Sequence, residues 1–177
     1  MTESDDIAIT AATSEDAEDI AALQTLSWQT TYRGLFPDAF LDDDMAHRFD
    51  CHWRTMLADP PERSVILAAR REGRILGFIA ALPTEAPETA FIDNIHIAPD
   101  AHGRGLGTKL MATCADRLTA LGYRATYLKV AFENARARAF YRHLGGRESE
   151  KFLDDIAGFR VPAARFDWDD LDALSEV

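Results

Sequence analysis

The chain has 177 residues, of which 47% are hydrophobic and 28% are charged. This balance is typical of one folded globular domain and excludes a disordered or low-complexity chain. The net charge of −11 argues against nucleic acid as a partner, because binding to phosphates needs basic side chains. It suits a cationic substrate such as an amine, although solubility alone is the simpler explanation.

No segment indicates a membrane span or a secretory route. The longest apolar stretch, Ile75 to Leu82, is too short to cross a bilayer, and residues 1–6 are acidic where a signal peptide would be basic. The two cysteines, Cys51 and Cys114, form no CxxC pattern, so we expect reduced, partly buried packing residues. We therefore expect a cytoplasmic protein with no membrane partner.

The first sixty residues are predicted to form a strand over 7–11 and two helices within about 13–58. In the first helix, Ile20, Leu23 and Leu26 recur at helical spacing and are expected to form its inner stripe. Pro60 and Pro61 end the second helix.

The pattern then changes to strands separated by helices. The predicted elements are a hairpin over 64–83, a strand over 90–98, a helix over 103–122, a strand over 125–132, a helix over 134–146 and a hairpin over 152–168. This order predicts one α/β domain of mixed α+β type over 1–177. Its central, mixed and twisted sheet should have about six to seven strands flanked by about four helices. The acidic tail after Trp168 is expected to be loosely held.

The most informative stretch is NIHIAPDAHGRGLGTKL, a strand followed by a loop with three glycines and the start of a helix. A helix N-terminus offers unpaired N–H groups, and glycine lets the backbone approach an anion closely. Gly103, Gly105 and Gly107, with Arg104 and Thr108 beside them, are suited to hold a pyrophosphate. Close packing is the alternative reason for such glycines. The spacing matches neither the Rossmann fingerprint nor the P-loop.

A second stretch, VAFENARARAFYRHLGG, places Asn134 and Tyr141 seven residues apart across a helix start. Each residue alone has an ordinary explanation. Asn134 suits a helix N-cap, and Tyr141 suits an aromatic residue packed on the inner face of the helix.

Together the two stretches resemble motifs A and B of the GCN5-related N-acetyltransferase (GNAT) superfamily. In motif A, written Q/R-x-x-G-x-G/A, Gly105 and Gly107 match, while His102 stands where Gln or Arg is usual. Motif B, written N-x-x-A-x-x-F/L-Y, is matched by Asn134, Ala137, Phe140 and Tyr141. The motifs lie within about 91–145, and the resemblance covers about 65–167.

The resemblance implies acetyl-CoA as the acyl donor and a direct transfer to an amine. Asn134 would contact the pantetheine or phosphate portion, and the Tyr141 hydroxyl would donate a proton to the departing thiolate. The strands before the two motifs would splay apart and admit the pantetheine arm. The main chain that would contact the cofactor is that of Ile95, His96, Ile97, His102, Gly103, Arg104, Gly105, Leu106, Gly107 and Thr108.

The general base cannot be carried over from the family. Relatives place a Glu on one of two strands where this chain has Phe91 and Lys129. The local catalytic candidates are His96 and Asp93, and an ordered water chain is the alternative. Because strand side chains alternate, Asn94 and His96 share one face and Asp93 lies on the other unless a bulge intervenes.

On the acceptor side we expect Trp28, Tyr32 and Asn94 to contact the substrate. Trp and Tyr can stack on a cationic amine, with core packing as the alternative. The sequence therefore predicts an N-acetyltransferase acting on a primary amine of a small molecule or a peptide, with no metal. A non-catalytic acetyl-CoA-binding sensor is the alternative, and a homodimer stays open because relatives often dimerise.

Overall fold

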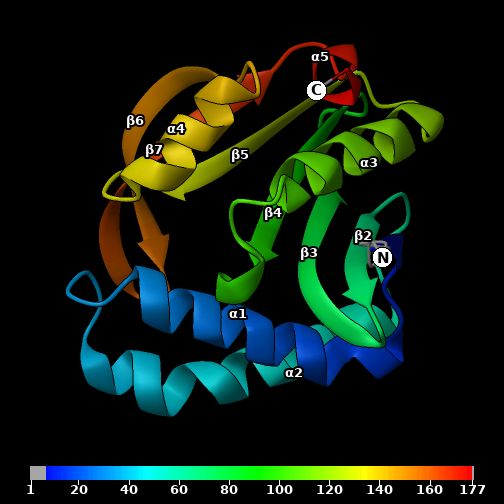
Figure 1. Ribbon diagram of the computed structural model, residues 1–177. Helices are drawn as coiled ribbons and strands as arrows, with labels where there is room; N and C mark the ends of the chain where they lie inside the picture. The colour runs from blue at the N-terminus through cyan, green and yellow to red at the C-terminus, as the bar shows by residue number, and fades with distance from the viewer. Residues whose placement is uncertain (1–6, 177) are drawn as a thin grey trace.

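The computed structural model describes residues 7–176, so the acidic segment 1–6 considered above lies outside the described residues. The chain forms one seven-stranded sheet in the order β1-β2-β3-β4-β5-β7-β6 (Figure 1). Its strands are β1 (Ala8–Ala11), β2 (Val65–Arg71), β3 (Arg74–Pro83), β4 (Thr89–Ile97), β5 (Ala125–Ala131), β6 (Arg147–Ile156) and β7 (Phe159–Trp168). Only β4 and β5 pair in parallel, which confirms the expected mixed sheet.

Five α-helices accompany the sheet in the described part of the chain. They are α1 (Ala17–Thr31), α2 (Met45–Ala58), α3 (Leu106–Ala120), α4 (Ala135–His143) and the short α5 (Asp172–Ser175). The predicted helix over 103–122 begins later than expected, because the loop residues Gly103 and Gly105 precede it with positive φ angles. Among the described residues, no helix combines the length and apolar character needed to span a membrane.

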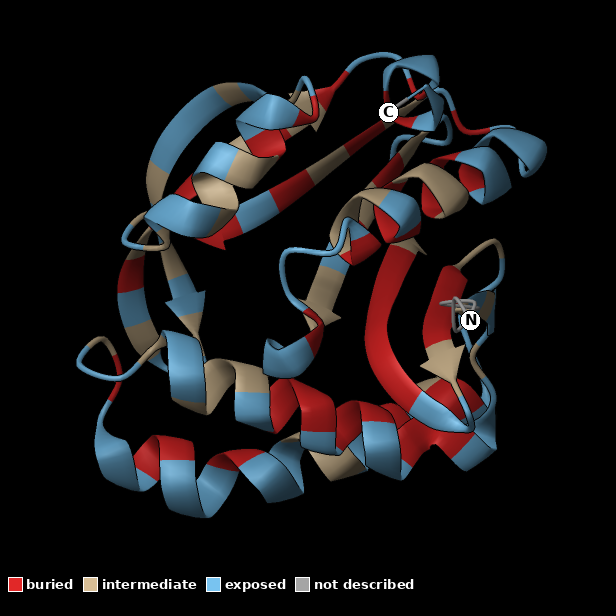
Figure 2. Ribbon diagram, in the orientation of Figure 1, coloured by how far each residue is buried: buried red, intermediate tan, exposed pale blue. Residues whose placement is uncertain are grey.

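The helices lie in two layers, with α1 and α2 on one face of the sheet and α3 and α4 on the other (Figure 1). Successive residues of β3 show this division. The Phe78 ring lies 5.2 Å from the Trp53 ring of α2, whereas a Cβ added at Gly77 would lie 3.2 Å from Leu110 of α3. Because helices cover both its faces, β3 is an almost continuous apolar run and is almost entirely buried (Figure 2).

The sheet opens at a bulge in β4. Ala80 of β3 lies opposite Asn94, and the adjacent Ala81 lies opposite Ile92, so Asp93 is an extra residue. The parallel pairing of β4 with β5 ends at the same point, since its last pair is Ile92 with Leu128. A bulge bends its strand, and here β4 continues along β3 while β5 continues along β7.

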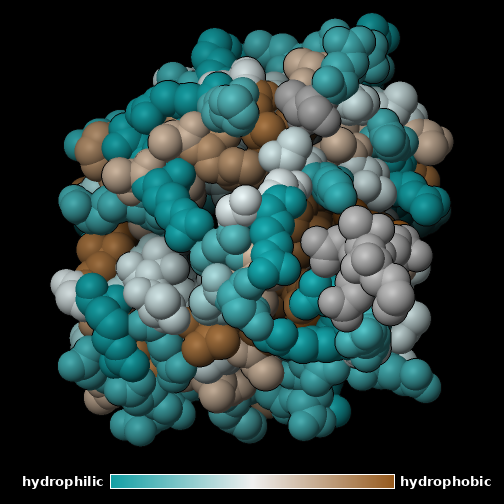
Figure 3. Space-filling view, in the orientation of Figure 1, coloured by the Kyte–Doolittle hydropathy of each residue, from teal (hydrophilic) through white to brown (hydrophobic). Residues whose placement is uncertain are grey.

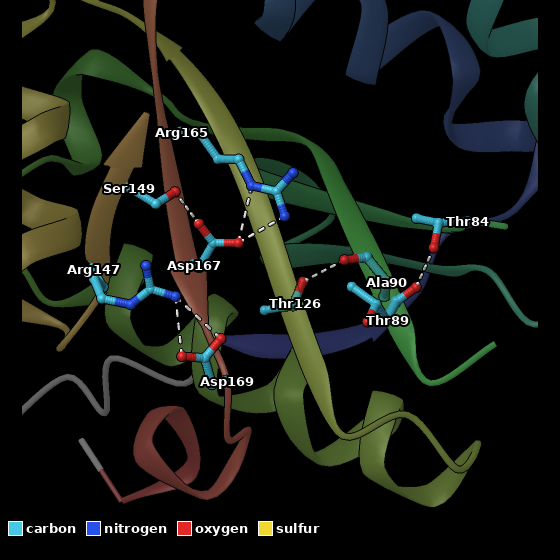
Figure 4. A network of polar contacts seen from close by, with 9 residues as sticks. All are labelled: Thr84, Thr89, Ala90, Thr126, Arg147, Ser149, Arg165, Asp167 and Asp169. Atoms are coloured by element: carbon cyan, nitrogen blue, oxygen red, sulfur yellow. Dashed lines mark hydrogen bonds and ion pairs between the residues drawn. The ribbon is translucent and has the colours of Figure 1, made fainter. Parts of the chain in front are cut away.

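Before the strands diverge, polar contacts hold them together (Figure 4). The Thr126 hydroxyl of β5 donates a hydrogen bond of 3.0 Å to the Ala90 carbonyl of β4. On the other side of β5, Asp167 of β7 accepts hydrogen bonds from Arg165 and from Ser149 of β6. The opening between β4 and β5 is therefore confined to one end of the sheet, and hydrogen bonds hold the strands together at the other end.

The inner face of α1 differs from the predicted stripe. Ile20 and Leu23 are buried, but Leu26 is 48% exposed, and the polar Gln24 is buried in its place. The reason lies in α2, because the Trp53 indole N–H needs an acceptor and Gln24 supplies it at 2.6 Å.

Two further expectations were wrong. The segment after Trp168 is not loosely held, because Leu171 and Leu174 are buried and α5 contacts α3. Cys51 is exposed on α2 rather than partly buried, while Cys114 is buried; both thiols are free. The face of the molecule shown in Figure 3 is mostly hydrophilic, with apolar side chains visible only in small patches.

Candidate functional site

A cleft of about 640 Å³ opens where β4 and β5 diverge. Residues 91–96 of β4 and 128–131 of β5 form two of its walls, and α1, α2, α4 and the tip of the β6–β7 hairpin contribute the others. Beyond Ile92 the edge of β4 that faces β5 has no register with that strand. An extended ligand arm can therefore add to this edge as a further strand would.

The main chain of Ile95 and Ile97 belongs to this segment of β4. On their other side these two residues pair with Ile79 and Gly77 of β3. The His102 ring reaches back to β4, with Nε2 3.0 Å from the Ile97 carbonyl oxygen. A carbonyl oxygen has two lone pairs, so this contact leaves one for another donor.

The loop that follows β4 carries the first predicted motif to the N-terminus of α3. Gly103 and Gly105 have φ angles of 75° and 73°, and a Cβ added to either would meet nothing within 4 Å. Among the described residues, no side chain caps this helix. The loop before α3 thus offers open backbone at Gly103 and Gly105 next to the N–H groups of the first turn, which is the environment that an anionic phosphate group needs.

Gly107 has a different role from the other two glycines. A Cβ at this position would lie 3.1 Å from Cζ of Phe140, so the missing side chain lets α4 approach α3. Leu106 is buried in the core, which leaves only its main chain for a ligand, and Arg104 is exposed beside it. Close packing therefore explains Gly107, whereas Gly103 and Gly105 leave the open backbone that the phosphate explanation requires.

The second motif brings α4 to the same cleft. Asn134 caps α4 by accepting a hydrogen bond of 3.1 Å from the Ala137 N–H, and the Tyr32 side chain, just past the C-terminus of α1, lies close to it. Tyr141 is buried against Phe166, yet it lines the cleft. Tyr32, expected at the acceptor, lies beside both residues of the second motif.

Burial raises the pKa of the Tyr141 hydroxyl, and the nearby Tyr32 hydroxyl raises it further. The hydroxyl has no hydrogen-bond partner among the described residues. Tyr141 therefore stays protonated at neutral pH, with its O–H available to a ligand in the cleft.

Asp93 is the acidic group at the bulge, and its side chain remains accessible to solvent through the cleft. The surrounding protein displaces bulk water and raises the pKa of the carboxyl, an effect that positive charge on His52 and Lys129 opposes. Lys129 is shared with the β6–β7 hairpin, because its Nζ lies 3.9 Å from Oδ1 of Asp154.

The bulge changes which side chains of β4 meet. Asn94 donates a hydrogen bond of 2.7 Å to the Asp93 carboxylate, although neighbours on a regular strand point to opposite faces. His96 lies farther along, with Nδ1 2.9 Å from the Ser27 hydroxyl of α1, and burial lowers its pKa to about 4. The imidazole is therefore neutral at physiological pH.

Trp28 of α1 forms part of the cleft wall and of an aromatic cluster at once. Its ring lies 4.9 Å from that of Tyr32, 5.5 Å from that of Phe36 and 5.6 Å from that of Phe49. Both explanations considered for Trp28, pocket lining and packing, therefore describe its position.

Sequence reasoning missed several cleft residues. Gln24 and Ser27 on α1, His52 on α2 and Asp154 on the hairpin all line the cleft. Of these residues, only Gln24 has a local signal in the sequence. It directly follows Leu23 and so lies near the apolar side of the helix, where a polar residue is unusual. The others come from elements whose approach to β4 has no local signal.

Proteins of one family resemble this chain over much of its length. A family model described as the acetyltransferase (GNAT) family matches residues 20–145. An uncharacterized N-acetyltransferase of Bacillus subtilis, YuaI, is 25% identical over 166 residues, covering 92% of this chain and 93% of the relative. The [ribosomal protein bS18]-alanine N-acetyltransferase of Salmonella typhimurium is 31% identical over 113 residues, covering 64% of this chain and 75% of that protein.

The fold is also that of solved acetyltransferases. The PaiA N-acetyltransferase of Thermoplasma acidophilum, crystallised in complex with coenzyme A, superimposes with a TM-score of 0.73 at 17% identity. The match covers 89% of this chain and 97% of that protein. At this identity the likeness establishes the fold.

Proposed function

The chain belongs to the acetyltransferase (GNAT) family, and on that premise we propose that it transfers the acetyl group of acetyl-CoA directly to a primary amine of a small molecule or a peptide. Membership makes it an acyl-CoA-dependent acyltransferase. One observation carries the finer proposal. The cleft between the splayed strands β4 and β5 is lined by Asn134 and by Tyr141 of α4, and α4 packs through Phe140 against Gly107 in the first turn of α3, whose start is uncapped.

The residues present fit a coenzyme A thioester. The side-chain-free backbone at Gly103 and Gly105 suits the pyrophosphate, and the unpaired edge of β4 at Ile95 and Ile97 suits the amide-bearing pantetheine arm. Acetyl-CoA supplies a thioester, whose carbonyl carbon accepts the amine nitrogen as its C–S bond breaks. The start of α3 would hold the pyrophosphate of coenzyme A before and after this step.

Tyr141 is proposed to assist the departure of the thiolate. Its raised pKa keeps the hydroxyl protonated, so the O–H can donate to sulfur as negative charge develops there. Tyr141 lines the cleft, which supports this role because a ligand bound there can reach its side chain.

Asp93 is proposed to bind the acceptor ammonium and to take its proton, directly or through water. An ammonium has a pKa near that of lysine, about 10, and must lose a proton before it can attack. Desolvation raises the pKa of Asp93 and so makes it a stronger base than an ordinary carboxylate. His96 is less suited to this role, because burial lowers its pKa to about 4 and Ser27 already engages Nδ1.

The proposal is tested by two measurements on the purified chain. Isothermal titration with acetyl-CoA should show binding, and thiol release should rise when a panel of amines is added. The panel should hold a polyamine, free amino acids, an aminoglycoside and a peptide with a free N-terminus. Binding without thiol release for every amine would instead favour the sensor, and no binding would overturn both.

A further inference from the structure

Four side chains from three elements form a continuous hydrogen-bonded chain into the cleft. Trp53 Nε1 of α2 lies 2.6 Å from Gln24 Oε1 of α1, and Gln24 Nε2 lies 2.8 Å from Asn94 Oδ1 of β4. Asn94 Nδ2 then lies 2.7 Å from Asp93 Oδ2. The chain thus connects a buried indole with the acidic group that faces the cleft.

The direction of this chain is fixed by its first member. An indole N–H is a donor only, so Gln24 must turn its oxygen toward Trp53 and its amide NH₂ toward Asn94. Asn94 must then present its oxygen to Gln24 and its own NH₂ to Asp93. Each side chain therefore allows only one orientation of the next amide. At the end of the chain the Asn94 NH₂ group donates to the Asp93 carboxylate.

Burial makes the arrangement stringent. Trp53 is 0% exposed and Gln24 is 4% exposed, so reversing either contact would leave a buried polar group without a partner. The hydrogen bond between Asn94 and Asp93 also requires the bulge at Asp93. Without the extra residue, Asp93 and Asn94 would point to opposite faces of β4 and could not meet.

We propose that Gln24 is a positioning residue that, through Asn94, holds the Asp93 carboxylate in the orientation that receives the acceptor amine. The inference rests on the role proposed above for Asp93. Gln24 acts through Asn94 rather than by contact with the substrate. It keeps an N–H donor on Oδ2 of Asp93, which leaves the other carboxylate oxygen for the acceptor amine.

Other charged groups border the same cleft and set the background for this effect. They are His52 and Arg48 of α2, Lys129 of β5, and Asp154 and Asp155 of the β6–β7 hairpin. His52 and Lys129 favour the ionised form of Asp93. None of these groups belongs to the hydrogen-bonded chain, so a change at Gln24 leaves their charges in place.

The main test compares Gln24→Met with Thr25→Val. Methionine keeps the size of Gln24 but can neither accept from Trp53 nor donate to Asn94. Thr25 is the matched control, because it is buried on the same helix and its hydroxyl donates only to the Ala21 carbonyl, at 2.8 Å. We expect kcat/KM for the amine to fall about 10–100-fold in Gln24→Met, as misplacement of a reacting group does, while the Kd for coenzyme A is unchanged. Thr25→Val should match the wild type in both.

Gln24→Glu gives a sharper readout because its behaviour depends on pH. When the new carboxyl is protonated, it accepts from Trp53 and donates to Asn94, as the amide does. When it is ionised it can only accept, so it turns Asn94 around and sets the Asn94 oxygen against Asp93. We therefore expect an alkaline limb in the pH profile of this variant that the wild type and Gln24→Met lack.

NMR spectroscopy tests the hydrogen-bonded chain independently of enzyme activity. The side-chain amide signals of Asn94 in ¹⁵N NMR should move in Gln24→Met and stay in place in Thr25→Val, with no substrate present. Unchanged Asn94 signals, or equal shifts in both variants, would overturn the inference. A chain that releases no thiol with any amine, yet shows the selective NMR shift, would overturn the proposed function and leave the hydrogen-bonded chain established.

Discussion

The Ser27 hydroxyl of α1 lies 2.9 Å from Nδ1 of His96 on β4. This contact ties the first helix to the strand segment that leaves β5, and it occupies one nitrogen of the imidazole. Burial of the ring lowers its pKa from 6.5 to about 4. His96 therefore lines the cleft as a neutral imidazole whose Nδ1 is engaged by Ser27.

Replacement of His96 by Gln tests this state. In the wild type the unfolded chain binds a proton near pH 6.5 and the folded chain only near pH 4, so stability is lost as the pH falls through that window. His96→Gln should remove this part of the acid sensitivity. Melting temperatures measured from pH 7 to pH 4 check it; parallel curves for the two proteins would contradict it.

Tyr141→Phe should lower kcat by about 10²–10⁴-fold, the usual contribution of general acid–base assistance. The affinity for coenzyme A and the melting temperature should change little, because the hydroxyl has no protein partner among the described residues and the ring contacts with Phe166 and Trp168 persist. Steady-state rates and isothermal titration together provide the measurement. Full activity in the variant would remove Tyr141 from the mechanism.

Asp93→Asn should lower the rate by about 10²-fold or more at every pH, since the proposed base is gone. In the wild type the rate should fall as the pH drops through the raised pKa of Asp93. That raised pKa also means that stability decreases as the pH rises through it, because the folded state holds the proton more tightly. The variant should therefore melt at a higher temperature than the wild type at pH 7, and this difference should vanish in acid.

Gly105→Ala tests the backbone at the start of α3. An alanine held at a φ of 73° costs about 1–2 kcal/mol, and its Cβ enters the open space offered to the phosphates. Gly122, with a φ of 87° beyond the opposite end of α3, is the matched control. Both variants should lose similar stability, but only Gly105→Ala should weaken coenzyme A binding, by about tenfold or more. Equal affinities in the two variants would argue against a phosphate site there.

Asp16→Asn should destabilise the fold without affecting the cleft. Arg70 pairs with both Asp16 oxygens, at 2.6 and 2.7 Å, and Asp16 also accepts from the Thr13 N–H that precedes α1. Breaking this partly buried pair should cost about 1–3 kcal/mol in chemical denaturation. Since the Arg70 guanidinium lowers the pKa of Asp16, the wild-type advantage should begin to shrink as the pH falls below the ordinary value of 3.8 and should disappear below the lowered pKa.

A control for that experiment is Asp100→Asn. Asp100 pairs with Arg74 at 2.7 Å, but both side chains are more than half exposed. Little change in stability is expected, because water and salt screen such pairs. A loss as large as that of Asp16→Asn would show that burial does not distinguish the two pairs.

The sequence by itself determined the order of the elements, the mixed sheet and the family. These features depend on residues close together in the sequence. Apolar residues recur with a period of 2 in strands and 3.6 in helices, and both motifs are contiguous stretches around Gly105 and Asn134. The two motifs lie close together, with Gly107 against Phe140, because each sits at a strand-to-helix junction of two adjacent strands.

Tertiary structure alone decided how the acceptor side is built. The bulge at Asp93 follows from the register of β4 against β3, and the burial of Gln24 in place of Leu26 follows from Trp53 on another helix. The docking of α5 depends in the same way on α3. Periodicity shows that a helix has an apolar side, but the partner that covers it decides which polar group is buried and which hydrogen bond it must make.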